Sequence, residues 1–125
     1  MKSKDNIIVR KLDQRDLSSL STFLSRNALP EYSEDEYFRR FEFWWTSNPA
    51  FRSEDARGWI IEDINDPDYI KVFLGNIPVD YNINGKTYTS ASPSTWVVIK
   101  KYKRFSLKLL FLFIQQNKDI LINST

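Results

Sequence analysis

Residues 96–116 constrain the fold of this 125-residue chain more than any other segment. Residues 96–99 form an apolar run rich in β-branched side chains, which predicts a fully buried strand. The next five residues contain four cations. The helical spacing of the apolar residues that follow predicts a helix over residues 103–116. A strand that continues into a helix through a short basic turn indicates a domain in which helices pack on a sheet.

The first half of the chain predicts two helices set between strands. Asp13, with Asp16 three residues later, can begin the first helix, and Ser33 can begin the second. In order, the expected elements are a strand at 7–9, a helix at 14–26, a helix from Ser33 to just before Asn48-Pro49, a strand at 57–61 and a longer strand that starts at 69–74.

The second half of the chain predicts a hairpin, a helix and a last strand. Asn84-Gly85 is a strong signal for a type I′ turn, from which residues 86–89 leave as a strand. Residues 90–95, which include Pro93, interrupt this strand and predict a bulge before residues 96–99. A last apolar strand is expected at residues 119–123. The predicted order is therefore β-α-α-β-β-β-α-β in a single domain over residues 1–125.

Composition excludes several kinds of site. The chain has no Cys and no His, which excludes a thiol nucleophile, a triad that uses imidazole and the usual zinc sites, so no metal is expected. The absence of disulfides favours an intracellular, cytoplasmic protein. The longest apolar-rich run, residues 107–114, is far shorter than the roughly 20 residues of a membrane span, so no membrane partner is expected.

Residues 96–110, W-V-V-I-K-K-Y-K-R-F-S-L-K-L-L, together with the element order, resemble the GNAT superfamily of acyl-coenzyme A-dependent N-acyltransferases. The family has a buried strand, a loop of the form Q/R-x-x-G-x-G/A and then a helix. Lys103 takes the basic first position of this loop, while Ser106 and Lys108 take its two small-residue positions. The resemblance implies an α/β (α+β) fold with a mixed, mostly antiparallel sheet flanked by helices, here without the last strands of the family domain.

The resemblance also implies a co-substrate, which is acetyl-coenzyme A or another acyl-coenzyme A. Backbone amides at a strand-to-helix turn, with the positive end of the helix dipole, can hold its pyrophosphate. The implied contacts are the strand edge at Val97, Val98 and Ile99 for the pantetheine arm, and the turn at Lys103, Arg104, Phe105, Ser106, Leu107 and Lys108 for the phosphates.

The reaction of the family is attack of an amine on the acyl thioester, and the resemblance suggests groups for it. A backbone amide at Val97 or Val98 could polarise the carbonyl, and Glu62 is the candidate base. Tyr102 or Tyr88 could protonate the leaving thiolate. For Glu62 the alternative is a solvated charge at the end of a strand, and for either tyrosine it is packing. The acceptor amine stays unidentified.

Two further functions stay open. The first is a non-catalytic module with this fold that acts in binding or dimerisation. The second is nucleic-acid binding through residues 100–104, where cations surround an aromatic ring. The charges are unevenly distributed: residues 31–68 carry eleven acidic and four basic side chains, whereas residues 86–125 carry one acidic and seven basic. Nucleic acid is the less favoured partner, because the acidic part of the chain repels a long polyanion.

The predicted last helix and last strand indicate a partner chain. Leu107, Leu110, Phe111 and Ile114 form one apolar side of the helix, and Leu109, Leu112 and Phe113 form another. A helix that is apolar nearly all round is normally covered on both sides. The last strand would also present an unpaired apolar edge. These features predict a homodimer, with exchanged strands as one possible form. The Trp44-Trp45 pair is expected in the core or an interface, with a ligand platform as the alternative.

Overall fold

The computed structural model describes residues 6–28, 32–116 and 120–121. The elements follow the predicted order, and their bounds are β1 (Ile7–Lys11), α1 (Leu17–Asn27), α2 (Glu34–Phe41), β2 (Gly58–Asp63), β3 (Ile70–Ile83), β4 (Lys86–Val98), α3 (Leu107–Ile114) and β5 (Ile120–Leu121). A 3₁₀ turn at Gln14–Asp16 precedes α1, a π-helical turn at Glu42–Thr46 extends α2, and a 3₁₀ turn at Lys100–Phe105 joins β4 to α3.

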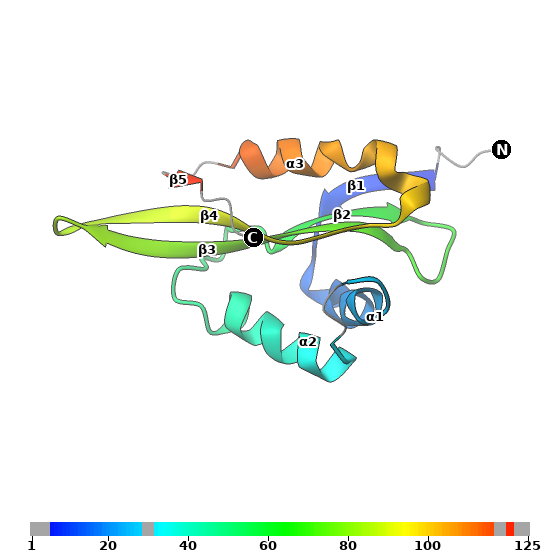
Figure 1. Cartoon of the computed structure of the whole chain (residues 1–125), viewed down its shortest axis with the longest axis horizontal. Helices are drawn as coiled ribbons and strands as arrows, with labels where there is room; N and C mark the ends of the chain where they lie inside the picture. Colours follow the sequence, from blue (N-terminus) through cyan, green and yellow to red (C-terminus); the bar gives the residue numbers. More distant parts are fainter. Residues whose placement is uncertain (1–5, 29–31, 117–119, 122–125) are drawn as a thin grey trace.

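The strands form one five-stranded sheet in the order β1-β2-β3-β4-β5. The first three pairings are antiparallel, whereas β5 runs parallel to β4 and pairs Ile120 with Ser90 and Leu121 with Ala91. Helix α3 covers one face of the sheet, and α1 and α2 cover the other (Figure 1). The prediction of a mixed, mostly antiparallel sheet between helices is confirmed.

Successive side chains of the central strands point to opposite faces of the sheet and pack against different helices. On β2, Ile60 packs in the cluster beneath α1 and α2, whereas Trp59 and Ile61 pack in the cluster beneath α3. The Trp59 ring meets the Phe113 ring of α3 edge to face, with centroids 6.1 Å apart. A strand buried on both faces needs apolar residues at successive positions, and residues 59–61 provide them.

Local capping sets where the first two helices begin. The Asp13 amide donates to the Asp16 carboxylate at 2.7 Å, and the chain makes one 3₁₀ turn before α1 starts at Leu17. Ser33 Oγ accepts from the Glu36 amide at 3.1 Å, as the sequence predicts. Ser33 therefore satisfies a free amide in the first turn of α2, whereas Asp16 holds the 3₁₀ turn that precedes α1.

Trp45 lies in the core, which confirms the structural interpretation of the Trp44-Trp45 pair. Its side chain is 1% exposed and stacks on Phe41 with ring centroids 5.2 Å apart. Its indole Nε1 donates to the Asn76 carbonyl at 2.8 Å, which ties the end of the α2 segment to β3. Trp44 is partly buried against the same cluster.

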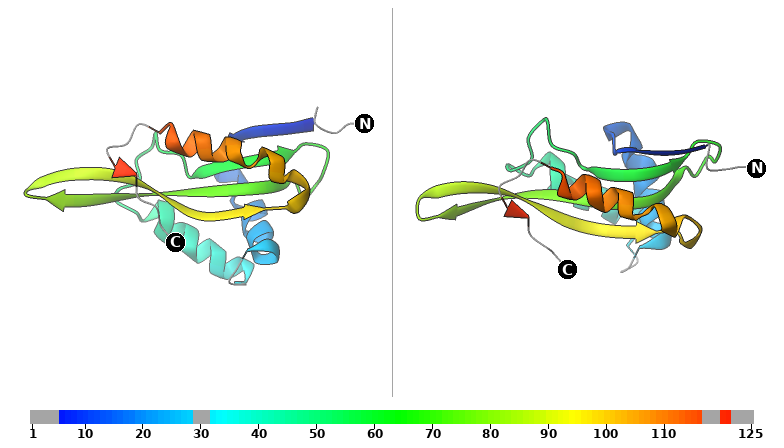
Figure 2. Two further views of the ribbon diagram at one scale, coloured as in Figure 1. Left: turned by 45° about the horizontal axis from the view of Figure 1, so that its top comes forward. Right: turned by 90° about the horizontal axis from the view of Figure 1, so that it is seen from above.

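The hairpin and the bulge are where the sequence places them. Asn84 and Gly85 both have positive φ, at 53° and 81°, as a type I′ turn requires. Leu74 pairs with Trp96 and Asn76 pairs with Pro93, so β4 has one extra residue at this point. Strand β4 continues through the bulge from Lys86 to Val98, as the predicted element order requires. The two-stranded arm extends beyond the helices (Figure 2).

Two other predictions need correction. The strand at 96–99 is not fully buried, because Trp96 is 42% exposed. The described part of β5 covers β4 only at Ser90 and Ala91, so the outer edge nearer Trp96 has no strand beside it among the described residues. The last helix begins at Leu107 rather than at 103, because the preceding residues form the 3₁₀ turn. Beyond Ile120–Leu121, the strand expected at 119–123 lies outside the described residues.

Candidate functional site

The basic turn joins a strand to a helix, as predicted, and it is tightly hydrogen-bonded. The Ile99 carbonyl accepts from the Tyr102 amide at 2.8 Å. The Lys103 carbonyl accepts twice from Ser106, from its amide at 3.1 Å and from its hydroxyl at 2.8 Å. The Leu109 amide in turn donates to the Ser106 carbonyl at 3.1 Å. These bonds bring the chain into α3 within one turn.

The start of α3 has an electrostatic character suited to an anion. The amides of Leu107 and Lys108 are the first of the helix, where the dipole is positive. No acidic side chain lies in the first turn. Among the residues that the structure describes, Lys103, Arg104 and Lys108 form no ion pair with a carboxylate. The cations at this turn are therefore available to a ligand.

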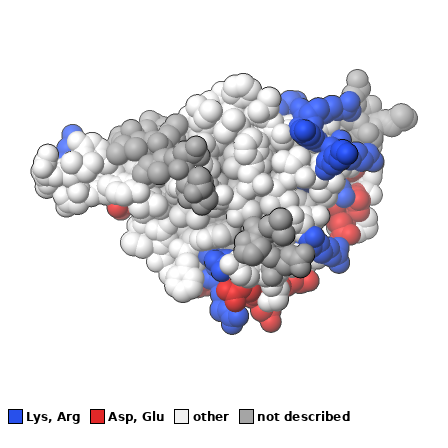
Figure 3. Space-filling view, in the orientation of Figure 1, with Lys and Arg blue, Asp and Glu red and all other residues white. Residues whose placement is uncertain are grey.

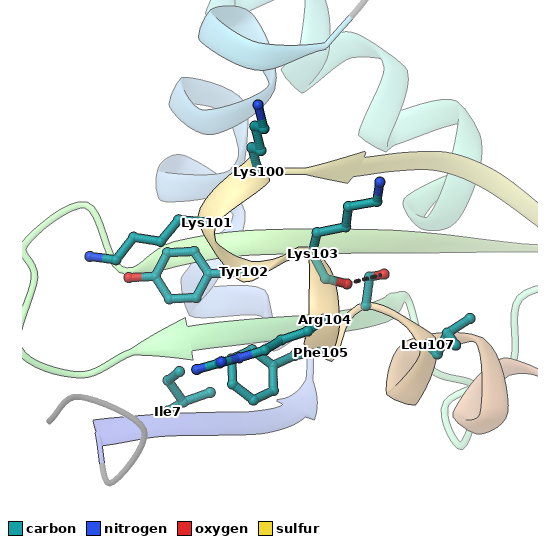
Figure 4. A pocket seen from close by; sticks show the side chains of 9 residues that line it. Ile7, Lys100, Lys101, Tyr102, Lys103, Arg104, Phe105 and Leu107 are labelled. Atoms are coloured by element: carbon teal, nitrogen blue, oxygen red, sulfur yellow. Dashed lines mark hydrogen bonds between the residues drawn. The ribbon is translucent and has the colours of Figure 1, made fainter.

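The four cations of the turn point to two sides (Figure 4). Arg104 extends toward Ile7 of β1 and Lys101 extends along the Tyr102 ring, whereas Lys100 and Lys103 extend upward in this view, away from Ile7. Two recesses flank the turn accordingly. The larger, of about 760 Å³, is lined by Ile7 and residues 100–107. The smaller, of about 450 Å³, is lined by Trp96, Val98, Lys100, Lys103 and Ser106.

The smaller recess combines the strand edge with the start of the helix. Trp96 and Val98 come from the part of β4 whose outer edge no described strand covers. Lys103 and Ser106 come from the turn, and Ser106 is 9% exposed. An uncovered edge offers backbone donors and acceptors to an extended ligand, and the turn offers cations next to helix amides.

The predicted binding residues differ in what they present. The Val97 side chain is 9% exposed and packs toward α1 and α2, so this residue offers backbone atoms only. The Ile99 amide donates to the Lys71 carbonyl at 3.1 Å and is therefore already used. The Phe105 ring has Arg104 Cζ 4.9 Å from its centroid and Lys108 Nζ 5.9 Å from it. The Lys108 ammonium thus lies on the Phe105 side of the helix start.

Tyr102 lies at the larger recess, but its hydroxyl is engaged elsewhere. The side chain is 6% exposed, and the hydroxyl donates to Asp63 Oδ2 at 2.9 Å. Burial, with the hydrogen bond to Asp63, raises the pKa of Tyr102 to about 12. The hydroxyl is therefore protonated near neutral pH and directed at a carboxylate. Tyr88, the alternative tyrosine, lies in the hairpin arm opposite Tyr81.

Glu62 is not brought to either recess. Its carboxylate accepts from Arg10 Nε at 2.8 Å, and Arg10 also binds Asp16. Glu62 is absent from the residues that line the recesses beside the turn. The structure thus places this candidate base in an ion-pair network next to α1.

Sequence reasoning missed two residues of the site. Ile7 of β1 lines the larger recess and Trp96 lines the smaller one, although the sequence predicted both only as strand residues. Ile7 reaches the turn only because the sheet order brings β1 to the side of α3. Trp96 lies in the part of β4 whose outer edge has no strand beside it among the described residues.

Comparison with known proteins identifies the fold. No protein-family model matches the sequence, and no curated protein sequence is significantly similar to it. Among solved structures, aminoglycoside N-acetyltransferase AAC(6′)-Iy in complex with CoA is similar with a TM-score of 0.63 at 9% identity, covering 95% of this chain and 76% of that chain.

Two other crystal structures show the same likeness. Arabidopsis thaliana NAA60 in complex with acetyl-CoA has a TM-score of 0.58 at 15% identity, covering 87% of this chain and 67% of that chain. A GNAT family acetyltransferase from Staphylococcus aureus has a TM-score of 0.57 at 12% identity, covering 96% of this chain and 87% of that chain. The chain therefore has the acyl-coenzyme A N-acyltransferase fold, with its antiparallel strands flanked by helices.

Proposed function

We propose that this chain, which has the GNAT fold, binds an acyl-coenzyme A and transfers its acyl group to an amine. The observation that carries the proposal is the smaller recess, where the uncovered edge of β4 meets the cationic turn and the start of α3. Its ligand would be anionic at one end and extended at the other. The structures of similar fold that contain CoA or acetyl-CoA support this class of ligand.

The residues of the turn fit the phosphates of such a ligand. The first amides of α3, at Leu107 and Lys108, can donate to phosphate oxygens, and Lys103 adds a positive charge without a carboxylate partner among the described residues. Ser106 and Lys108 stand where the family has small residues. Ser106 is compact, and the Lys108 ammonium lies near the Phe105 ring, so we propose that it leaves the first amides accessible.

The proposed reaction forms an amide bond and breaks a thioester. The amine nitrogen attacks the acyl carbon, the C–S bond breaks, the amine loses a proton and the sulfur gains one. We propose that a backbone amide of β4 at Val97 or Val98 polarises the carbonyl. The roles of Glu62 as base and Tyr102 as acid stay predictions. The hydrogen bonds of both side chains, to Arg10 and Asp63, favour structural roles instead.

Calorimetric titration with acetyl-coenzyme A tests the proposal. We expect the titration to show saturable binding. We also expect the bound ligand to raise the melting temperature of the protein, because a ligand at a hundred times its Kd stabilises a folded protein by about 2.7 kcal/mol. Lys103→Ala should abolish the shift. Lys86→Ala is the matched control, because Lys86 is an exposed lysine at the far end of β4 and should leave the shift unchanged.

The outcomes separate the functions that remain open. If no acyl-coenzyme A stabilises the protein at millimolar concentration, the acyltransferase proposal fails. Binding without amide formation across a panel of amines would favour a non-catalytic binding module. A salt-sensitive gel shift with RNA or DNA would favour the nucleic-acid alternative.

We also propose a cytoplasmic homodimer that pairs through the outer edge of β5. Among the described residues, β5 has β4 on one side and no strand on the other. An unpaired edge can recruit a second chain. Light scattering at high protein concentration should give twice the monomer mass, and a monomer at every concentration would refute the dimer.

A further inference from the structure

One side of α3 exposes an apolar strip. Leu107, Phe111 and Ile114 are 58%, 62% and 50% exposed, and their spacing of four and three residues puts them on one side of the helix. The other side, with Leu109 and Phe113, is buried against the sheet. Three large apolar side chains exposed together mark a surface that binds a protein, a membrane or a ligand.

Cations adjoin the strip at the start of the helix. Lys101 and Arg104 line the larger recess together with Leu107, the first residue of the strip, so the recess and the strip form one continuous surface. Lys108 follows in the first turn of the helix. Residues 86–116 include six basic and no acidic side chains. In Figure 3, Lys and Arg gather at the upper right, above the beginning of α3, and acidic side chains appear lower in the view.

A membrane surface fits this combination of chemistry. We propose that the α3 strip and its adjoining cations dock on an anionic phospholipid surface, with the three apolar side chains among the acyl chains and the headgroup phosphates at Lys101 and Arg104. Amphipathic surfaces with Lys, Arg, Phe and Leu bind anionic lipid in this way, by apolar burial plus attraction to the headgroups. Docking needs no span, and no helix within the described ranges is long and apolar enough to cross a bilayer.

A second copy of the chain fits the strip less well. Helix α3 has eight residues and is therefore about 12 Å long. A stable protein interface buries roughly 800 Å² on each partner, which is more than three side chains can supply. Two copies joined here with parallel α3 helices would also bring their clusters of cations toward each other. Anionic lipid neutralises these charges instead.

Vesicle flotation tests the proposal with the intact chain. We expect the protein to float with vesicles of phosphatidylcholine and phosphatidylserine at least tenfold more than with phosphatidylcholine alone, and added salt should reduce the bound fraction. Phe111→Asp should lower binding about tenfold, because it places a charge within the strip. Phe43→Asp is the matched control: Phe43 is 76% exposed next to α2, in the opposite layer, and this variant should bind as the wild type does.

Charge variants and a soluble anion complete the test. Lys101→Glu should lower vesicle binding several-fold, and Arg39→Glu on α2 should not. Inorganic phosphate at the concentration of the lipid headgroups should not displace the protein, since it lacks the apolar part of the ligand. Circular dichroism should show that each variant is folded.

Three results would overturn the inference. Equal losses for Phe111→Asp and Phe43→Asp would show that the strip has no special role. If Lys101→Glu lowers vesicle binding and Phe111→Asp does not, the cations bind polyanions in general and the apolar strip does not contribute. Absence of vesicle binding, with a wild-type dimer that Phe111→Asp converts to a monomer, would assign the strip to a second copy. Calorimetry with acetyl-coenzyme A on Phe111→Asp should match the wild type, so the two proposals can fail independently.

Discussion

Arg10 holds Asp16 through two parallel hydrogen bonds, from Nη1 at 2.8 Å and from Nη2 at 2.9 Å. Asp16 is 1% exposed and also accepts from the Tyr69 hydroxyl at 2.7 Å. Burial alone would raise the pKa of Asp16, but the hydrogen bonds from Arg10 and Tyr69 and the Asp13 amide outweigh it and lower the pKa to about 2. This pair joins β1 to the beginning of α1.

Asp16→Asn should destabilise the protein in a pH-dependent way. The folded pKa lies below the ordinary value of 3.8, so the ionised carboxylate contributes stability above pH 3.8 that is lost as the pH falls toward 2. We expect a loss of about 2 kcal/mol at pH 7. Urea unfolding of both proteins at pH 7, 4 and 2.5 measures it. If the difference in unfolding free energy between the two proteins stays constant from pH 7 to 2.5, the ion-pair explanation is contradicted.

Trp45→Phe should cost about 1 to 3 kcal/mol of unfolding free energy. The substitution keeps an aromatic ring in the core but leaves the buried Asn76 carbonyl without its indole donor. Denaturant melts measure the loss. Phe43→Ala, two residues earlier and 76% exposed, should change stability by less than about 0.5 kcal/mol. Equal effects of the two substitutions would show that the hydrogen bond contributes nothing.

Gly75→Ala should disturb the bulge of β4. A Cβ at this position would overlap Ser94 Oγ and also approach the Phe73 ring, and Ser94 lies in the bulge opposite. We expect a loss of about 1 to 3 kcal/mol from overpacking. The double variant Gly75→Ala with Ser94→Gly removes the hydroxyl and should recover part of the loss. If the double variant is no more stable than Gly75→Ala, the Ser94 contact is not the cause.

Tyr102→Phe distinguishes packing from acid catalysis. The hydroxyl donates to Asp63, so its removal should lower stability by about 1 kcal/mol at pH 7. The raised pKa means that the folded state favours the neutral tyrosine, so this contribution is present below pH 10 and lost as the pH rises through about 12. For an acyltransferase, kcat should change less than about threefold. A fall of a hundredfold or more, with KM for acetyl-coenzyme A unchanged, would instead make Tyr102 the acid.

Much of the fold is determined by local sequence, since its signals act over a few residues. Ser33 begins α2 because its hydroxyl can reach the Glu36 amide, and Asn84-Gly85 turns the hairpin because both residues tolerate positive φ. Pro93 marks the bulge, because proline cannot donate to a strand ladder. The element order, the strand-to-helix turn and the apolar sides of α3 follow from such local patterns.

Tertiary structure decided where the predicted site residues lie and which other side chains line the recesses with them. Glu62 is paired with Arg10 because β1 lies beside β2, and no local pattern encodes that neighbour. Trp96 is 42% exposed and lies where no described strand flanks β4, although its own sequence resembles a buried strand. Local sequence sets backbone conformation through short-range sterics and hydrogen bonds. Burial, ion pairing and the shape of a recess depend on residues distant in the chain, which meet only when the sheet and its helices assemble.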